Sequence, residues 1–132
     1  MERLRALARF LMSGKTFTES FFFGGFNFNP GSKYPPKDKQ GNVCFGQCGC
    51  ALTQYVGINS NWKLNKKGLP VRGDEHSTFR SAEIEFGLTE EQVLHLFQPG
   101  HQKTKLYGGK ELDHRASAKD VAKNIFAFCD MN

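Results

Sequence analysis

Apolar residues recur at helical spacing in five stretches of this sequence, which predicts a mainly α fold. The first stretch covers residues 2–12, where Leu4, Leu7 and Leu11 share one face and arginines occupy the others. The Ser-Gly pair that follows is expected to end this helix. Its length and amphipathic character are ordinary for a surface helix, so we expect it to pack on the core rather than on a membrane or a nucleic acid.

A second helix, from about Phe45 to Val56, is predicted to form the centre of the core. Gly46 and Gly49 each cost about 1 kcal/mol of helix propensity relative to Ala, so we expect them to let a neighbouring backbone come close. Gly57 is the expected end of this helix. The residues on its inward face are Phe45, Cys48, Leu52, Tyr55 and Val56.

Three further helices are predicted in the second half of the chain, each with a local start or stop signal. Thr89 and Gln92 have the spacing of a capping box, in which each side chain bonds the other's backbone. Glu85 and its neighbouring carboxylates are expected to be solvated. The predicted spans are Ser77–Phe86 followed by Gly87, Thr89–Phe97 followed by Pro99-Gly100, and Ser117–Asp130 with Cys129 facing the core.

Residues 15–30 contain six phenylalanines. Short strands at 16–19 and 26–28, joined by a turn at residues 24–25, predict a hairpin; an extended loop is the alternative. We expect these rings in the core or in the interface of a homo-oligomer, because so much apolar surface is costly in water. A stacking platform for single-stranded nucleic acid is disfavoured, since no basic residue lies among the rings. They are Phe17, Phe21, Phe22, Phe23, Phe26 and Phe28.

The length of 132 residues suits one domain, residues 1–132, with an α+β fold as the alternative to a mainly α one. No run of about 20 apolar residues occurs, so no transmembrane helix is predicted. Arginines interrupt the first segment, which excludes a secretory leader of the usual kind. We therefore expect a cytoplasmic protein with reduced cysteines, located in the host cytoplasm if a phage encodes it.

The net charge of +5 is distributed unevenly along the chain. Residues 1–73 carry eleven Lys/Arg and three acidic residues, whereas residues 74–132 carry seven Lys/Arg and ten acidic residues. A basic half suggests an acidic partner, which would be a protein surface, a nucleic acid or a nucleotide. The alternative is that the two halves complement each other within the fold.

The basic side chains fall mainly in three segments predicted as loops, residues 30–42, 58–76 and 103–110. The second of these segments contains Trp62 and the third contains Tyr107. We expect the partner to contact Lys33, Lys37, Lys39, Trp62, Lys63, Lys66, Lys67, Arg72, Lys105, Tyr107 and Lys110.

Four cysteines raise the alternative of a structural zinc site formed by Cys44, Cys48, Cys50 and Cys129. The spacing does not give the two Cys-x2–4-Cys pairs that are typical of such sites. Cys48 and Cys50 would also point to different sides of a helix. We therefore expect no metal and no cofactor, with the thiols acting as small apolar groups.

Two catalytic or ligand-binding alternatives remain open. Cys48 near a helix start, with His114 as base, has the residue types of a cysteine-dependent hydrolase. The segment from Lys105 to Lys110 combines an aromatic ring, a Gly-Gly pair and two lysines, which suits a small anion or a nucleotide. Neither a Gly-x-Gly-x-x-Gly run nor a Walker A run is present.

The segment from Gly46 to Leu52, together with Leu112-Asp113-His114 and the last helix, resembles small helical domains of unknown function from actinobacterial and phage proteins. Those domains have a Cys-x-x-Gly-Ala-Leu core helix and a Trp-Asn-Asp loop. The Trp and the Asn of that loop are absent here. The resemblance implies a helical fold and a phage or accessory setting, and no activity.

The sequence thus predicts a non-enzymatic interaction protein, such as a phage accessory, anti-defence or host-takeover protein. It would engage an acidic partner through its basic loops. A module that sequesters a nucleotide or another small anion, and a cysteine-dependent hydrolase, are the alternatives.

Overall fold

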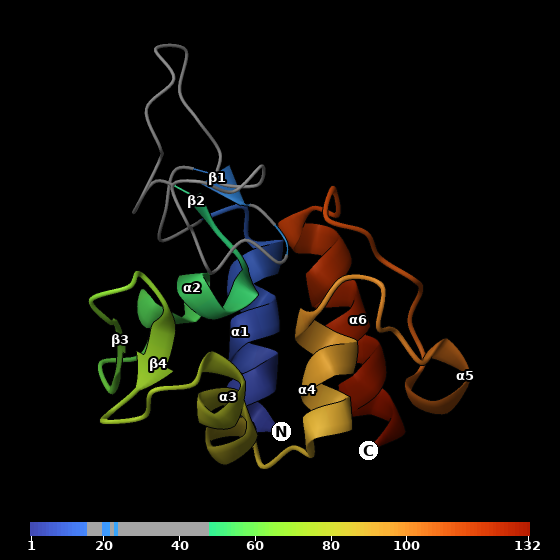
Figure 1. The fold of residues 1–132 in the computed structure, drawn as a ribbon. Coiled ribbons are helices and arrows are strands. Elements are labelled where there is room, and N and C mark those ends of the chain that lie inside the picture. Colours follow the sequence, from blue (N-terminus) through green and yellow to red (C-terminus); the bar gives the residue numbers. More distant parts are fainter. Residues whose placement is uncertain (16–19, 22, 24–47) are drawn as a thin grey trace.

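The computed structural model describes residues 1–15, 20–21, 23 and 48–132, and it gives only the backbone for 20–21 and 48–49. In this part of the chain the protein is mainly α, as predicted, with six helices and two small two-stranded sheets (Figure 1). The helices are α1 (Glu2–Met12), α2 (Ala51–Val56), α3 (Thr78–Phe86), α4 (Glu90–Phe97), α5 (Thr104–Tyr107) and α6 (Ala118–Met131).

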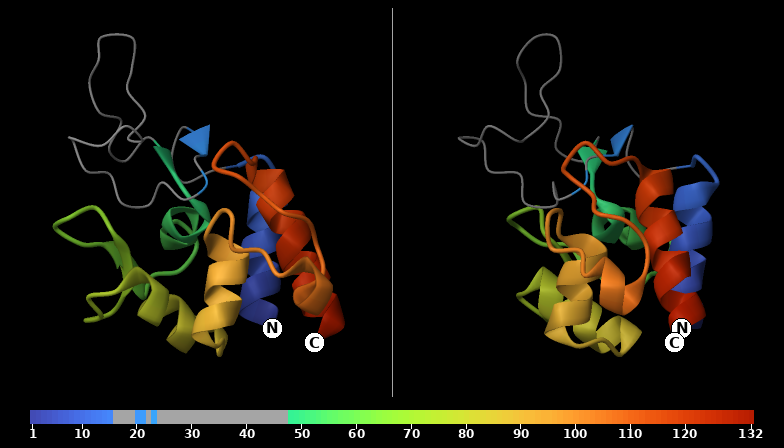
Figure 2. Two further views of the ribbon diagram at one scale, coloured as in Figure 1. Left: turned by 45° about the vertical axis from the view of Figure 1, so that its right-hand side comes forward. Right: turned by 90° about the vertical axis from the view of Figure 1, so that its right-hand side faces the viewer.

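Helices α1 and α6 form an antiparallel pair, and the chain ends lie at the same end of it (Figures 1 and 2). The inward face of α1 carries Leu4, Leu7 and Leu11, which are fully buried, as the spacing of apolar residues predicted. On α6 the corresponding residues include Val121 and Ile125. Burying each of these aliphatic side chains contributes roughly 1.5–3 kcal/mol relative to exposure, so this pair is the main support of the fold.

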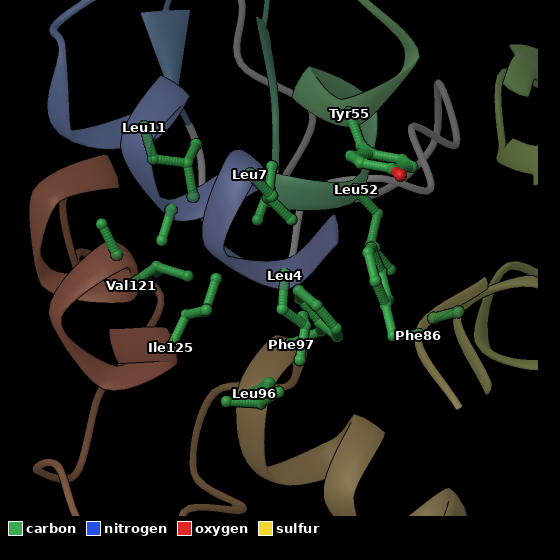
Figure 3. Packing of buried hydrophobic residues seen from close by; sticks show 14 of the residues in the cluster. Leu4, Leu7, Leu11, Leu52, Tyr55, Phe86, Leu96, Phe97, Val121 and Ile125 are labelled. Carbon is green, nitrogen blue, oxygen red and sulfur yellow. The ribbon is translucent and has the colours of Figure 1, made fainter. Parts of the chain in front are cut away.

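Helices α2, α3 and α4 complete one core around α1, as Figure 3 shows. Leu52 and Tyr55 reach it from α2, Phe86 from α3, and Leu96 and Phe97 from α4. The ring centroids of Phe86 and Phe97 lie 5.9 Å apart, and those of Tyr55 and Phe86 lie 5.1 Å apart. Both distances are within the range of favourable aromatic contacts.

Local signals placed the ends of three helices correctly. The Ser77 side chain caps α3, and Gly87 ends it in the left-handed conformation, at φ +66°. Thr89 and Gln92 form the predicted capping box of α4. Ser117 caps α6 in a second capping box, with Asp120.

The central helix begins later than the sequence predicted. Cys48–Gly49 forms strand β2, which pairs in parallel with β1 (Ser20–Phe21), and Cys50 is the extended N-cap residue of α2. Two glycines within four residues make a helical first turn costly here, because the nucleus of a helix must already overcome a large entropy loss. The structure does not describe the side chain of Cys48, so its predicted inward orientation stays a prediction.

The segment 58–76, predicted as a loop, contains an antiparallel hairpin of β3 (Trp62–Leu64) and β4 (Pro70–Arg72). Strands of three residues are too short to show an alternating pattern, and Pro70 is unusual in a strand. The four-residue helix α5 was missed for the same reason, its short length.

Of the phenylalanine-rich segment, the structure describes the backbone of Phe21 and the fully buried Phe23. The rest of the predicted hairpin, and the predicted contact residues Lys33, Lys37 and Lys39, lie outside the described residues. None of the helices in the described ranges is both long enough and apolar enough to cross a bilayer.

Candidate functional site

The β3–β4 hairpin is closed by a turn that the side chain of Asn65 organises. Its Oδ1 atom accepts hydrogen bonds from the backbone N–H groups of Lys67 (2.9 Å) and Leu69 (3.0 Å). The backbone N–H of Asn65 donates to the carbonyl of Leu69 at 2.9 Å. Gly68 supplies the left-handed conformation, at φ +79°, that the turn needs. Asparagine is favoured in such turns because its side chain can replace a backbone acceptor.

The base of the hairpin is fixed to the core by one aromatic side chain. Trp62 is only 3% exposed and packs edge-on against Tyr55, with ring centroids 5.2 Å apart. On the other strand, the backbone N–H of Arg72 donates to the Ser81 hydroxyl at 3.0 Å. The hairpin is therefore attached to both α2 and α3, and its turn projects from a fixed base.

A buried carboxylate beneath the hairpin, that of Glu85, connects four elements. It accepts hydrogen bonds from the Tyr55 hydroxyl (2.7 Å), the Asn59 amide (3.1 Å) and the Arg72 Nε (2.8 Å). Arg3 of α1 adds an ion pair at 3.6 Å. Glu85 was expected to be solvated, but it is 5% exposed, so that prediction is wrong. One signal was available: Glu85 is three residues after Ala82, on the apolar face of α3.

The surroundings of Glu85 favour its charged form. Burial alone would raise the pKa of this carboxyl group, but hydrogen bonds from Tyr55 and Arg72, the indole N–H of Trp62 and the charge of Arg3 lower it. The indole N–H of Trp62 contributes although it falls short of full hydrogen-bond geometry. Burial and the bond to Glu85 raise the pKa of Tyr55 to about 12, so this hydroxyl remains a donor at neutral pH.

Three exposed lysines on the hairpin, Lys63, Lys66 and Lys67, make no ion pair within the described part of the chain. Residues 58–73 contain no Asp or Glu that could neutralise them locally. In residues 74–132, Lys103 pairs with Glu91, Lys110 with Asp120, and Arg115 with Asp113, whereas the dispersed lysines Lys105, Lys119 and Lys123 make no ion pair among the described residues. The hairpin thus presents positive charge that the described fold does not use.

The structure separates the other predicted contact residues of this segment from those lysines. Trp62 was expected to contact a partner, but its burial against Tyr55 makes it part of the core, so that prediction is corrected. Arg72 is held by the Glu85 carboxylate, although its side chain remains 38% exposed. The lysines at the turn are therefore the accessible part of the predicted basic segment.

The segment from Lys105 to Lys110 owes its Gly-Gly pair to packing. A Cβ atom on Gly109 would lie 2.5 Å from Oδ1 of Asn124, and Gly109 has a φ of +78°. The Asn124 amide pairs with the backbone of Lys110, accepting from its N–H (3.0 Å) and donating to its carbonyl (2.8 Å). The Lys110 ammonium contacts Asp120 at 3.1 Å. These Lys110 donors are therefore engaged within the fold.

The other two predicted contact residues of this segment, one basic and one aromatic, differ in exposure. Lys105 is exposed on α5. Tyr107 is half-buried, with its ring 5.0 Å from that of His95 and 5.5 Å from that of Phe128. Only Lys105 is fully available to a ligand here.

The described cysteines have the properties of core residues. Cys50 is a buried free thiol whose pKa is raised by burial to about 11. Cys129 is also buried and free, as predicted, and burial raises its pKa. No group of three potential metal ligands occurs among the residues that the structure describes. Cys44 and the side chain of Cys48 lie outside them.

The alternative catalytic pair, Cys48 and His114, stays a prediction because the Cys48 side chain is not described. His114 is exposed in the loop before α6. Strand β2 and that loop lie at the same end of the molecule (Figures 1 and 2).

No family model, no curated protein and no solved structure matches this chain.

Proposed function

We propose that this protein is a non-enzymatic binding protein whose β3–β4 hairpin engages an acidic partner. The observation that carries the proposal is the set of three exposed lysines, Lys63, Lys66 and Lys67, that are free of ion pairs in the described structure. They lie on or beside a turn that Asn65 closes with two side-chain hydrogen bonds. The partner is a nucleic acid or an acidic protein surface.

The fixed geometry of the hairpin supports this proposal. A cation on a preorganised turn loses less conformational entropy on binding than one on a flexible loop. Unpaired charge also speeds the approach of an oppositely charged partner, and this acceleration decreases with ionic strength. Because Trp62 and Arg72 attach the hairpin to the core, the hairpin can keep its conformation when a partner binds.

The resemblance to helical domains of phage and actinobacterial proteins suggests the setting for this proposal. An accessory protein that acts by occupying the acidic surface of a host component needs a stable basic surface and no catalytic residues. The β3–β4 hairpin meets that requirement.

The proposal is tested by comparing two charge-matched variants. In the hairpin variant, Lys63, Lys66 and Lys67 are replaced by Glu; in the control, Lys15, Lys119 and Lys123 are replaced instead. The control lysines are also exposed and unpaired within the described ranges. Each variant replaces three lysines by glutamate, so the two variants have the same net charge. Binding to labelled mixed-sequence DNA, to RNA and to polyglutamate is measured at several salt concentrations.

We expect the hairpin variant to lose at least about tenfold in affinity at low salt. The slope of log affinity against log salt concentration should become shallower by the amount that corresponds to the loss of about two or three charge contacts. The control variant should retain most of the wild-type affinity. Equal losses in the two variants would show that only net charge matters, and would overturn the assignment to the hairpin. Preference for DNA, RNA or polyglutamate identifies the class of partner.

A further inference from the structure

The imidazole of His95 is fully buried in α4, and its two nitrogens have different environments. Nδ1 accepts a hydrogen bond from the backbone N–H of Lys103 at 2.8 Å. Nε2 is buried and has no hydrogen-bond partner among the described residues. Because Nδ1 is an acceptor, the ring is neutral and its proton is on Nε2.

The groups around this ring do not favour an imidazolium ion. On α4 the nearest titratable group is Glu91, one turn earlier, and its carboxylate is paired with the Lys103 ammonium. The segment opposite contributes Lys103 itself and Tyr107, whose ring is 5.0 Å from that of His95. Helix α6 contributes the uncharged ring of Phe128, at 6.4 Å. Burial accordingly lowers the pKa of His95.

The segment that bonds to His95, residues 98–112, is held by a few polar side chains. Gln102 is the first: it accepts from the N–H groups of Gly100 and Leu112, both at 3.1 Å. Its amide donates to the carbonyls of His95 (2.9 Å) and Gln98 (2.8 Å). Asn124 holds the segment again at Lys110. The only helix in it is α5, of four residues, so this part of the fold should open more easily than the α1–α6 pair.

We propose that His95 is a pH-sensitive latch, which releases residues 103–108, including α5, from α4 and α6 when Nδ1 becomes protonated. An N–H on Nδ1 would face the N–H of Lys103, so the hydrogen bond would be replaced by a contact between two donors. The new charge would also be buried, beside the rings of Tyr107 and Phe128. Opening of the segment relieves both costs by bringing water to the ring.

The direction of the pH effect follows from the two states of the latch. The open state leaves His95 in water and takes up a proton near the ordinary histidine value of about 6.5. The closed state takes up a proton only at lower pH, because its ring is buried. The closed state is therefore stable above about pH 6.5 and loses stability as the pH falls below that value.

Release of the latch would change one hollow in the surface of the protein. A depression of about 640 Å³ lies between the start of α4 and this segment, and its lining includes Glu91, His101, Lys103 and Tyr107. Movement of Lys103 and Tyr107 would remove one wall and expose the ring of Phe128. This device is independent of the hairpin lysines and goes beyond the proposed binding function.

The test is amide hydrogen exchange measured by NMR between pH 7.5 and 5, corrected for the intrinsic pH dependence of exchange. The reporting amides are that of Lys103, which donates to Nδ1 of His95, and those of Leu106, Tyr107 and Gly108, which donate to carbonyls within this segment. We expect their protection to fall by about tenfold per pH unit, the slope for one proton. Amides of α1 serve as the internal control and should stay more strongly protected than these four at every pH, because they exchange only when a larger part of the fold opens.

His95→Asn supplies a matched variant, because its Oδ1 can accept from the Lys103 N–H and does not titrate in this range. In this variant the protection of the same amides should be independent of pH. An equal fall in the variant, or constant protection in the wild-type protein, would overturn the proposal.

A second measurement decides the matter even if the variant does not fold. The ¹⁵N shifts of the four imidazoles are followed in the wild-type protein. Loss of amide protection must track the titration of His95. If it tracks His76, His101 or His114, or if His95 takes up a proton while the amides stay protected, the latch is refuted.

Discussion

Replacement of Glu85 by Ala is the most informative test of how the base of the hairpin is held. The change removes the acceptor for Tyr55 (2.7 Å), Asn59 (3.1 Å) and Arg72 (2.8 Å), and it leaves the Tyr55 hydroxyl without an acceptor in the core. Breaking a buried ion pair from one side costs about 3–5 kcal/mol. Arg72 is 38% exposed and can be rehydrated, so we expect the lower end of that range, about 3 kcal/mol.

The assay is urea unfolding followed by the fluorescence of Trp62, the single tryptophan, which lies beside Tyr55. The transition midpoint should shift while its slope is retained, because the surface exposed on unfolding is nearly unchanged. Glu83→Ala is the control on the same helix, since among the described residues Glu83 forms an ion pair with the exposed Arg80 alone. It should cost less than about 1 kcal/mol. Similar costs for the two variants would refute the reasoning.

The same carboxylate also predicts how stability depends on acid. Because its pKa is lowered in the folded protein, Glu85 stabilises the fold above the unfolded-state value of 4.5. That contribution is lost as the pH falls through the lower folded-state pKa. Glu85→Gln should therefore be less stable than the wild type at neutral pH, and the gap should narrow toward low pH in urea titrations. A constant gap would contradict this account.

The remaining predictions concern one turn and the described thiols. Gly109→Ala should destabilise the protein by roughly 2–4 kcal/mol in urea unfolding, because it combines a positive φ with a clash against Asn124. Gly100→Ala has a similar φ, of +80°, but open space around it, so it should cost only about 1–2 kcal/mol; equal costs would exclude the clash. In peptide-level thiol labelling at pH 8, Cys50 should react about 100-fold more slowly in the folded than in the unfolded protein, and Cys129 should also be protected. Rapid labelling of either in the folded protein would contradict their assignment to the core.

Much of the helical framework could be predicted because its determinants are local. Thr89 with Gln92, and Ser117 as a cap, mark helix starts through contacts within one turn. Gly87 ends α3 by adopting a conformation that other residues avoid. The spacing of apolar residues in residues 2–12 identified the face of α1 that is buried.

Two features that were missed, the start of α2 and the burial of Glu85, depend on contacts between distant parts of the chain. The start of α2 is displaced where Cys48–Gly49 pairs with Ser20–Phe21, residues that no local pattern connects. The partners of Glu85 come from α1, α2, the segment after α2 and β4. The sequence therefore placed Glu85 in water, although its position on the apolar face of α3 was a usable signal.

The candidate site was predicted in part. The three lysines of residues 58–76 were identified from their charge, and all three are exposed on the hairpin. Their fixed presentation was not predicted, because it depends on the side-chain hydrogen bonds of Asn65 and on the burial of Trp62. A tryptophan beside lysines suggests a binding surface equally well when the ring is inside the core.

The claim that the β3–β4 hairpin binds an acidic partner is tested most directly by ¹H–¹⁵N NMR. The labelled protein is titrated, at low salt, with a short DNA, an RNA and an acidic peptide. The account predicts that amide shifts concentrate in residues 62–72, with the largest changes at Lys66 and Lys67, and that the amides around Lys119 and Lys123 stay unchanged. Shifts centred on another element, or equal shifts at all exposed lysines, would contradict it.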